Sequence, residues 1–505
     1  MRRTLRILTT PPALLAAITL LAALLRLVAL DRLPPGLYHD EAYNGLDALG
    51  VLRGETPLFF AANNGREPLF IYLAALGVGL LGPSPGALRV VSAVLGILTV
   101  PTTYGLGRAL FGRRVALLAA ALVATTVWTL NLSRVALRAV AAPPLAALAL
   151  ALLWRGLERR RWGLLTAGGA AYGALMYTYL AARVSVVALA AWFLYLAIWH
   201  RRRLWGRGVL VFSLAALAVA APLGVHLLAR GELFGRAGQV SVFSPAISGG
   251  DPWGTLARHA ARTALGFFWR GDFIARHNVP LRPVFDPLTA VAFLAGAVLA
   301  IRSARRSPAH ALTLIWVGTM LLPTVFAEDA PHMLRASGVL PVLLFLPALG
   351  LDALYALLTP LGSRWLAPAA VAVVLVVGGA EGVWRYARHL ESPAVYYQFE
   401  AGAAALAAEA NAYLGVGWQR EGIRAAGGNP TPGRTVYVTP RLWRDWASLR
   451  FLAAPAEARG LVHTDAASPE LAAAEDLALY LWPFEDDAGA LGLLPRDRLI
   501  VAREG

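Results

Sequence analysis

Two adjacent carboxylates and a histidine follow the first long apolar stretch of the sequence. They are His39, Asp40 and Glu41, in the segment GLYHDEAYNGLDALGVLRG. Carboxylates just outside a lipid-embedded helix could deprotonate an acceptor or hold a cation while the membrane delivers an apolar substrate. A solvated loop is the alternative. A second charged cluster, GREPLF at 65–70, ends the same polar stretch and favours a functional site.

The composition is that of a membrane protein. The chain is 58% hydrophobic and only 15% charged, whereas soluble domains carry about 25% charged residues. The net charge of +16 would suggest nucleic acid in a soluble protein, but here the basic residues lie in short loops between apolar runs. The basic residues therefore indicate which loops of a membrane protein lie in the cytoplasm, and no nucleic-acid partner is expected. The absence of cysteine excludes disulfides and thiolate metal sites.

Arginine-rich turns predict the membrane topology. These turns are Arg2–Arg6, Arg113–Arg114, Arg155–Arg161, His200–Arg207 and Arg302–Arg306. Placing all of them in the cytoplasm predicts about eleven spans with an internal N-terminus and an external C-terminus. The predicted spans are 12–30, 89–110, 115–132, 140–156, 163–180, 184–199, 208–228, 284–301, 309–326, 337–357 and 366–384. The first is expected to be retained rather than cleaved as a signal peptide.

The same pattern divides the chain into two predicted domains. Residues 1–384 form the membrane domain, an all-α bundle with large external loops at 31–88 and 230–282. The short apolar stretch Pro68–Leu81 is expected to be an interfacial or re-entrant helix on the outer face.

From residue 385 to 505 the long apolar runs stop, and a small external α/β domain is expected. Strands are predicted at 433–440 and 477–483, and helices at 398–414 and 443–452. This tail contains no catalytic motif.

Polar residues that could do chemistry fall on the external side of this topology. Arginines at the outer mouth of a bundle suit a phosphate group, which they bind with two parallel hydrogen bonds. A carboxylate on the same face could act as a general base while the arginines stabilise a departing phosphate. Snorkelling side chains and helix caps are the alternative. The residues are His39, Asp40, Glu41, Arg66, Glu67, Arg89, Arg134, Arg138, Arg183, Glu328, His332 and Arg335.

Other chemistries leave no motif in the sequence. The chain contains no lysine, so a phosphate-binding loop for ATP is excluded, and no HExxH motif occurs. No metal is the first expectation, with a divalent cation near Asp40 as the alternative. No internal repeat occurs, which argues against many transporter folds.

Several segments, in this order and spacing, resemble the membrane-embedded GT-C glycosyltransferases. The most similar groups are the dolichyl-phosphate-mannose protein mannosyltransferases and the lipid A aminoarabinose transferases, of glycosyltransferase family 39 type. The segments are YHDEAY (38–43), EPLFIYL (67–73), ALRVVSAVLGILTVPTTYGLGRALFGRRVALLAA (87–120), LSRVALR (132–138), LLWRGLERRR (152–161) and APHMLRASGVLPV (330–342).

The resemblance implies inverting transfer of a sugar from a polyprenyl-phosphate donor on the external face of the cell membrane. It implies that Asp40 is the catalytic base or its close partner, with Glu41 in support. It also implies that Arg89 is needed, and that His332 and Arg335 face the lipid phosphate. Arg89 and Arg335 both start predicted spans on the external side and are predicted to hold the donor phosphate. The remaining residues proposed to bind substrate are His39, Tyr43, Arg66, Glu67, Arg134, Arg138 and Glu328.

The chain departs from the family pattern in two places, and both bear on a second acidic residue that many relatives carry. Many relatives carry an aspartate just after the LSR segment, where this chain has Arg138, and a His-Pro pair where Glu67 and Pro68 stand. Glu67 and Glu328 are the two candidates for that acid.

The acceptor stays open between a protein, a polysaccharide and a lipid. A transporter or flippase for a lipid-linked glycan, and a catalytically silent scaffold, are the alternative functions. A transport pathway would place charges deep within the spans, whereas these cluster at one mouth.

Overall fold

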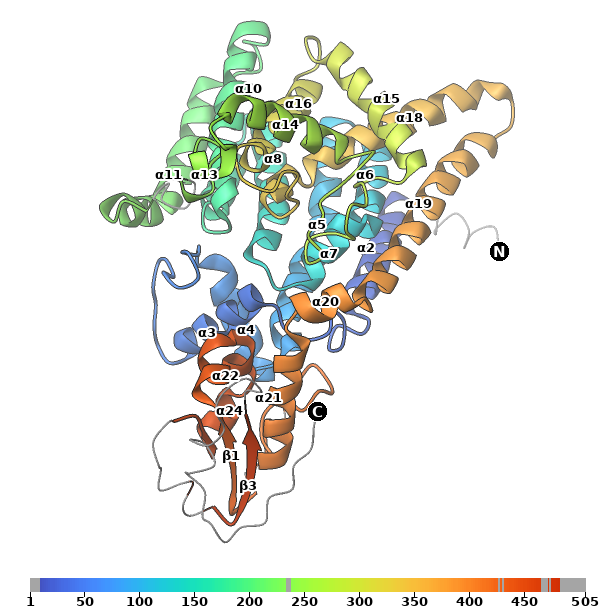
Figure 1. The fold of residues 1–505 in the computed structure, drawn as a ribbon. Helices are drawn as coiled ribbons and strands as arrows, with labels where there is room; N and C mark the ends of the chain where they lie inside the picture. The colour runs from blue at the N-terminus through green and yellow to red at the C-terminus, as the bar shows by residue number, and fades with distance from the viewer. Residues whose placement is uncertain are drawn as a thin grey trace. The chain divides into compact units, whose positions relative to one another are not determined.

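The computed structural model describes residues 10–232, 238–425, 427–428, 431–464, 471 and 474–481. The basic turn Arg2–Arg6 and the end of the predicted strand 477–483 lie outside these residues. The chain forms two compact units (Figure 1). Unit 1 comprises 1–28, 56–71 and 91–390, and unit 2 comprises 29–55, 72–90 and 391–505. Each unit is described by itself.

Unit 1 is a bundle of α-helices joined by short 3-10 turns. Two further helices, α4 (Leu69–Leu81) and α5 (Pro85–Leu110), have residues in both units. The helices of unit 1 are α2 (Pro11–Leu27), α6 (Arg113–Thr125), α7 (Val127–Arg134), α8 (Ala142–Arg159), α9 (Trp162–Leu175), α10 (Ser185–Trp199), α11 (Gly206–Ala229), α13 (Pro245–Ser248), α14 (Pro252–Leu265), α15 (Pro287–Ser303), α16 (Pro308–Met320), α17 (Leu322–Val325), α18 (Phe345–Leu358) and α19 (Leu366–Leu390).

The helices support a multi-pass membrane protein. Seven helical stretches in the described residues are long and apolar enough to cross a membrane, and the bent pair α6 and α7 makes up to eight. Each of the eleven predicted spans coincides with a helix or a pair of helices. However, α2, α9 and α15 contain only 17, 14 and 17 residues, whereas a span needs about 20. The helix predicted at Pro68–Leu81 is confirmed as α4, of 13 residues.

Glycines allow the bundle helices of unit 1 to approach one another closely. A Cβ atom at Gly296 of α15 would lie 1.8 Å from the carbonyl oxygen of Leu346, and one at Gly350 of α18 would lie 1.9 Å from that of Ala292. These two helices accordingly lie side by side (Figure 1). Small residues serve this purpose in membrane bundles because lipid provides no hydrophobic drive for helix association.

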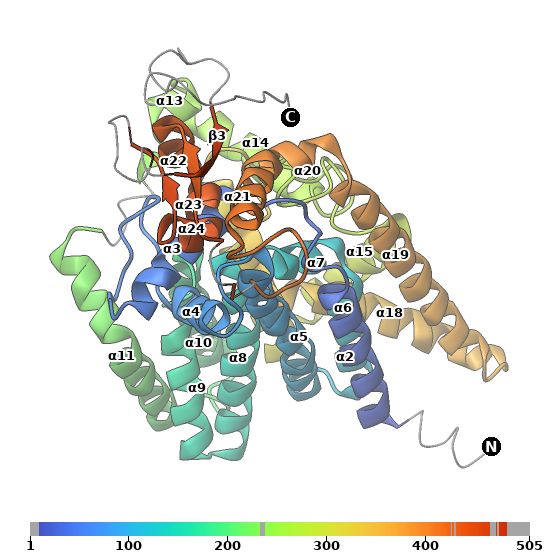
Figure 2. The ribbon, with the colours of Figure 1, turned by 90° about the horizontal axis from the view of Figure 1, so that it is seen from below.

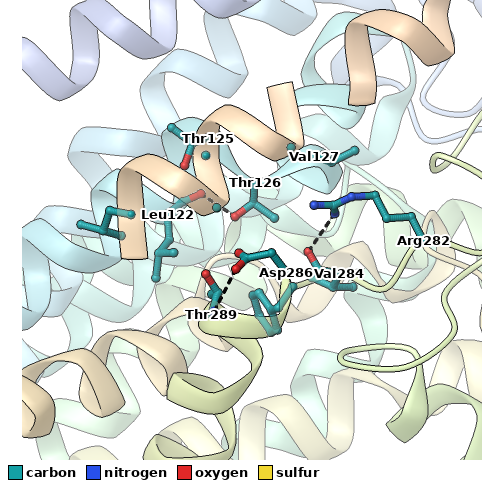
Figure 3. A pocket seen from close by; sticks show the side chains of 13 residues that line it. Leu122, Thr125, Thr126, Val127, Arg282, Val284, Asp286 and Thr289 are labelled. Carbon is teal, nitrogen blue, oxygen red and sulfur yellow. Dashed lines mark hydrogen bonds between the residues drawn. The ribbon is translucent and has the colours of Figure 1, made fainter. Parts of the chain in front are cut away.

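An aspartate fixes the start of α15. The Asp286 carboxylate accepts the backbone N–H groups of Leu288 and Thr289 at 3.0 and 3.1 Å, which satisfies donors that a helix start leaves unpaired. Figure 3 shows the second of these bonds. Arg282 donates to Glu381 of α19 beside it. Asp286 and Arg282 line a cavity with a volume of about 20 Å³. This is room for about one water molecule, so the cavity is part of the packing rather than a substrate site.

Unit 2 joins the tail of the chain to α3 (His39–Leu52) and to parts of α4 and α5. Its parallel sheet has the strand order β2-β1-β3, with β2 at Leu461–Val462, β1 at Arg434–Val438 and β3 at Asp476–Tyr480. Helix α21 packs against β1 (Figure 2). The tail helices are α20 (Pro393–Gln398), α21 (Ala401–Leu414), α22 (Pro440–Asp445), α23 (Ala447–Leu452) and α24 (Ala454–Glu457).

The predicted strands 433–440 and 477–483 are confirmed as β1 and β3 within the described residues, and the helix predicted at 398–414 as α21. The helix predicted at 443–452 is divided at Trp446, which has extended backbone angles, into α22 and α23.

Candidate active site

Helix α3 of unit 2 carries the adjacent acids, and its first turn gives them different environments. The Glu41 carboxylate accepts the backbone N–H of Tyr38 at 3.0 Å, three residues earlier, and so fixes the helix start. The Glu41 side chain is fully buried. Asp40 is half-buried. Of the two acids, Asp40 is therefore the one that solvent or a substrate can reach.

The buried carboxylate of Glu41 is bound by Arg89. The arginine Nε and Nη2 atoms donate to the two carboxylate oxygens at 2.9 and 3.0 Å, and both side chains are 0% exposed. The guanidinium also donates to the carbonyls of Pro34 and Gly36 at 2.7 and 2.9 Å. These contacts agree with a supporting role for Glu41. They favour a structural role for Arg89 over the predicted contact with a donor phosphate.

The turn before α3 requires glycine at position 36. Gly36 has a φ of +73°, and a Cβ atom there would lie 2.3 Å from the carbonyl oxygen of Phe399. Its own carbonyl accepts from Arg89. The close approach therefore places a backbone acceptor beside the buried guanidinium.

Residues from the tail surround the other predicted side chains of α3. His39 Nδ1 lies 3.4 Å from Glu400 Oε1, and this hydrogen bond raises the pKa of His39. The Glu400 carboxylate also accepts the Ser448 hydroxyl at 2.6 Å. Arg450 Nη2 donates to the Tyr43 hydroxyl at 3.4 Å, and the rings of His39 and Tyr43 are 4.8 Å apart. The sequence analysis missed the three tail residues because no local pattern links them to a helix several hundred positions earlier.

In unit 1, Glu67 holds two arginines. Its carboxylate oxygens accept from Arg138 Nη1 at 2.6 Å and from Arg183 Nη2 at 2.8 Å. The Glu67 side chain is 3% exposed, and those of Arg138 and Arg183 are 11% and 13% exposed. The cluster keeps one excess positive charge in a poorly solvated place, which suits an anionic ligand.

An apolar cavity of about 460 Å³ lies beside this cluster and includes Arg183. Arg335 also lines it. The Arg335 guanidinium is held by Glu328, through the backbone carbonyl at 2.7 Å and the carboxylate at 3.0 Å. The other lining residues are Tyr179, Leu180, Ala181, Val184, Val240, Ser241, Phe243, Leu322, Pro323, Phe326 and Ala327. The cavity thus joins a mostly apolar wall to two guanidinium groups.

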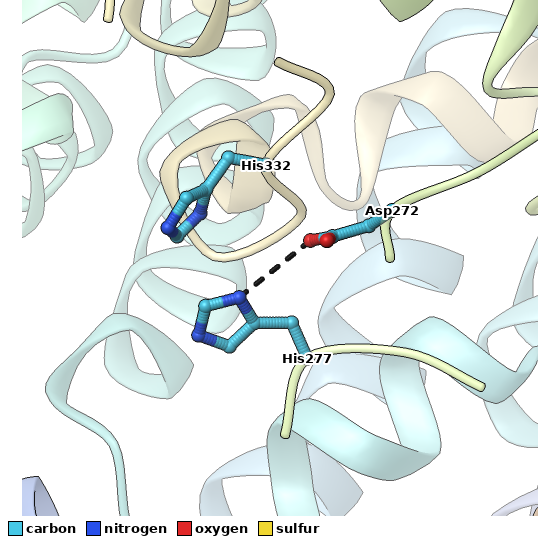
Figure 4. Close-up of side chains that lie close together, drawn as sticks. All are labelled: Asp272, His277 and His332. Carbon is cyan, nitrogen blue, oxygen red and sulfur yellow. Dashed lines mark ion pairs between the residues drawn. The ribbon is translucent and has the colours of Figure 1, made fainter. Parts of the chain in front are cut away.

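Buried loops of unit 1 bring together Asp272, His277 and His332 (Figure 4). One ligand atom from each lies within 4.8 Å of the others, and His277 Nδ1 is 3.5 Å from Asp272 Oδ2. Burial lowers the pKa of His332 well below its usual value, so the imidazole is neutral and can ligate a metal. Burial raises the pKa of Asp272, although that carboxylate accepts two backbone N–H groups.

One carboxylate and two imidazoles form a donor set that suits zinc. The sequence analysis placed a divalent cation near Asp40 as an alternative. Among the described residues, the potential ligands that converge are these three instead. Only His332 had been singled out. Asp272 and His277 lie five positions apart in the predicted external loop 230–282, and this spacing was the one local signal for the group.

The other predicted arginines bind backbone carbonyls. Arg134 Nη1 donates to the carbonyls of Leu25, Arg26 and Val28 at 2.9 to 3.2 Å, at the end of α2. Arg66 Nε donates to the Ala62 carbonyl at 3.1 Å. Both arginines are buried. These contacts support the local fold and give no indication of a substrate.

A family model described as dolichyl-phosphate-mannose-protein mannosyltransferase matches residues 65–226. The match confirms the resemblance seen in the sequence. With it, the prediction of a membrane glycosyltransferase is also confirmed. The matched region contains the residues of the Glu67, Arg138 and Arg183 cluster. No curated protein matches the chain significantly.

Similar solved structures show the GT-C fold. ArnT from Cupriavidus metallidurans, bound to undecaprenyl phosphate, is similar with a TM-score of 0.56 and 16% identity, over 92% of this chain and 89% of that one. The oligosaccharyltransferase AglB from Archaeoglobus fulgidus, in complex with an inhibitory peptide and a dolichol-phosphate, gives a TM-score of 0.52 and 14% identity over 88% of this chain and 64% of that one. A structure of an oligosaccharyltransferase from Archaeoglobus fulgidus with Zn and sulfate gives a TM-score of 0.51 and 14% identity, over 89% of this chain and 62% of that one.

Loss of one partner of the Glu41–Arg89 pair should destabilise unit 2 strongly. Replacement of Glu41 by Gln leaves a buried guanidinium without its carboxylate, and loss of one partner of such a pair costs about 3–5 kcal/mol. The double variant Glu41→Gln/Arg89→Met should be less destabilised than the sum of the two single variants. Chemical unfolding in detergent measures this coupling energy.

The exposed pair Arg53 and Glu55, 3.6 Å apart after the same helix, is the matched control. Exposed pairs contribute little, so the corresponding cycle with Arg53→Gln and Glu55→Gln should give almost no coupling. Equal coupling in the two cycles would contradict the structural role of Glu41 and Arg89.

Proposed function

We propose that this chain moves a sugar from a polyprenyl-phosphate donor to an acceptor on the external face of the cytoplasmic membrane, with inversion at the anomeric carbon. The observation that carries the proposal is the apolar cavity with Arg183 and Arg335 in its wall. An isoprenoid tail suits such a wall, and its phosphate suits two guanidinium groups. The undecaprenyl phosphate in the similar ArnT structure supports the same donor class.

The arginines would act on the leaving group. The acceptor oxygen forms a bond to the anomeric carbon, and the bond from that carbon to the phosphate oxygen breaks, with its electron pair passing to the phosphate. Guanidinium groups held by Glu67 and Glu328 are already oriented and need no reorganisation as charge develops on the phosphate.

Asp40 is proposed as the general base that takes the acceptor proton. Its partly open side chain at the start of α3 can be reached by an acceptor hydroxyl, whereas Glu41 is enclosed and bound to Arg89. His39 and Tyr43, with the tail residues beside them in unit 2, are proposed to contact the acceptor. The tail would thereby influence which acceptor is used.

We further propose that the chain crosses the membrane about eleven times, with α2, α9 and α15 as short spans. The five arginine-rich turns then lie in the cytoplasm, and the tail lies outside. The Asp272, His277 and His332 group is proposed to bind a divalent cation. A cation there would fix the loops that carry these side chains.

Donor affinity should depend on Arg335. The variant Arg335→Gln loses charge-assisted hydrogen bonds, which contribute about 1.5–3 kcal/mol and hence about 10- to 100-fold in affinity. The Arg335→Lys variant keeps the charge but loses the two parallel hydrogen bonds of a guanidinium. Its donor affinity should therefore lie between that of Arg335→Gln and that of the parent. Titration of purified protein with undecaprenyl phosphate in detergent measures the change.

Arg258 is a suitable control for that titration. It also pairs with a carboxylate, that of Asp251, but it is exposed and does not line the cavity. The Arg258→Gln variant should bind undecaprenyl phosphate as the parent does. Equal affinity in Arg335→Gln and Arg258→Gln would exclude the cavity as the phosphate site.

Turnover should depend on Asp40. A positioned general base contributes about 10²- to 10⁴-fold in rate, so Asp40→Asn should lose that factor while it binds undecaprenyl phosphate normally. Asp47 lies on the same helix and is also half-buried, and Asp47→Asn should keep most of its turnover. The measurement is transfer from a labelled polyprenyl-phosphate sugar in spheroplast membranes. Similar rates for the two variants would refute the assignment.

Metal content should depend on His277. Protein purified from zinc-supplemented medium is expected to retain zinc, measured by elemental mass spectrometry, and His277→Ala should lose most of it. His310, a histidine of α16 outside the group, serves as the control, and His310→Ala should keep the metal. Loss in both variants, or in neither, would argue against this site.

A further inference from the structure

A second charged cavity lies at the arginine-rich ends of the bundle helices in unit 1. It has a volume of about 280 Å³ and includes the end of α8, the end of α10 and the turn that leads into α11. The lining residues are Trp154, Leu157, Glu158, Arg160, Trp192, Leu196, Arg202, Arg203, Trp205 and Pro308. None of them belongs to the proposed donor cavity.

This cavity lies far from the Glu67 cluster. Arg138 precedes α8 and Arg160 follows it, and the helical stretch between them, 138–159, is long enough to cross a membrane. At about 1.5 Å per residue, such a stretch separates its two ends by roughly 30 Å. The cavity and the Glu67 cluster therefore lie at opposite ends of the same span.

The cavity carries an excess of positive charge. Three arginines, Arg160, Arg202 and Arg203, line it together with a single carboxylate, that of Glu158. Among the described residues, no salt bridge joins any of these arginines to a carboxylate. Their charge is thus available to an anion from outside the chain.

Tryptophans form the deeper wall of the cavity. Trp154 stacks on Trp192 with ring centroids 5.9 Å apart, and Arg203 lies 5.8 Å from the Trp154 ring. The Trp192 indole donates to the Pro308 carbonyl at 3.1 Å. Trp154, by contrast, is only 7% exposed, and its buried indole N–H has no hydrogen-bond partner. Buried indole donors usually find a partner, so this group calls for an acceptor.

We propose that this cavity binds the phosphate-bearing head group of an anionic phospholipid. The arginines would hold the phosphate, and the indole N–H of Trp154 would donate to a phosphate or ester oxygen. Leu157 and Leu196 would contact the first part of an acyl chain. Basic cavities between helix ends bind such head groups, and tryptophan is enriched where helices leave the bilayer. A lipid bound here would clamp α8, α10 and the turn before α11 together.

The test uses the full-length, delipidated protein in a neutral detergent. Its melting temperature is followed as phosphatidylglycerol, phosphatidylcholine or inorganic phosphate is added, and native mass spectrometry counts the retained lipid. Phosphatidylglycerol should bind and raise the melting temperature, whereas the other two should have little effect. Stabilisation by inorganic phosphate to the same extent would overturn the lipid assignment, and equal stabilisation by phosphatidylcholine would overturn the role of charge.

Matched variants connect this effect to the cavity. A basic residue near a charged membrane surface contributes about fivefold to binding. The double variant Arg202→Gln/Arg203→Gln should therefore weaken phosphatidylglycerol binding by about 25-fold. Arg202 and Arg203 are exposed, and Arg305→Gln/Arg306→Gln removes the same charge from another exposed turn, outside the cavity, so it should change binding much less. Trp154→Phe keeps an aromatic ring without the N–H donor and should also weaken binding. Equal losses in the two double variants, or unchanged binding in Trp154→Phe, would contradict the proposal.

Discussion

A buried charge must be compensated by an opposite charge or by hydrogen-bonding dipoles. In unit 2 the Glu41–Arg89 pair compensates itself in this way. A buried pair is stable only if further hydrogen bonds satisfy its remaining polar atoms. Here the Tyr38 N–H and the carbonyls of Pro34 and Gly36 supply them. The pair thereby fixes the start of α3, and the exposure of Asp40 follows from that position.

The same constraint explains the two departures from the family pattern. Arg138 stands where many relatives have an aspartate, and Glu67 stands where a histidine is common. The two residues contact each other at 2.6 Å. Without Glu67, Arg138 would be a largely buried charge without this carboxylate. Glu67 neutralises one of its two arginine partners, Arg138 and Arg183, and the cluster keeps one excess positive charge. The departures are therefore better understood as one coupled replacement than as two losses, and Glu67 is occupied as an arginine ligand.

Much of the fold could be predicted because its signals are local. Apolar runs bounded by arginine predicted the helices, and short apolar runs in the tail predicted β1 and β3 as buried strands. The adjacent acids and the family motifs singled out positions 38–43 and Arg335, but the helix α3 that carries the acids was not predicted, because 31–88 was interpreted as a loop around one short helix. The bend between α6 and α7, at 56°, was missed because both halves are apolar and form one continuous run in the sequence.

The parts that could not be predicted depend on contacts between distant segments. The acid and histidine that join His332 come from a loop some sixty positions earlier, and the carboxylate beside His39 comes from the tail. Arg89 was expected at a donor phosphate because its position at a helix start resembles that of a ligand-binding arginine. Only the fold reveals that a buried carboxylate already binds it.

The central claim is that the donor lies in the cavity between η2 (Leu180–Val184) and α17, with its phosphate on arginine. A cryo-electron microscopy structure of the protein with undecaprenyl phosphate tests this claim most directly. The account predicts density for the isoprenoid chain along Val184 and Phe326, with the phosphate within hydrogen-bonding distance of Arg183 and Arg335. Lipid density elsewhere in a map that shows this cavity empty would contradict the account.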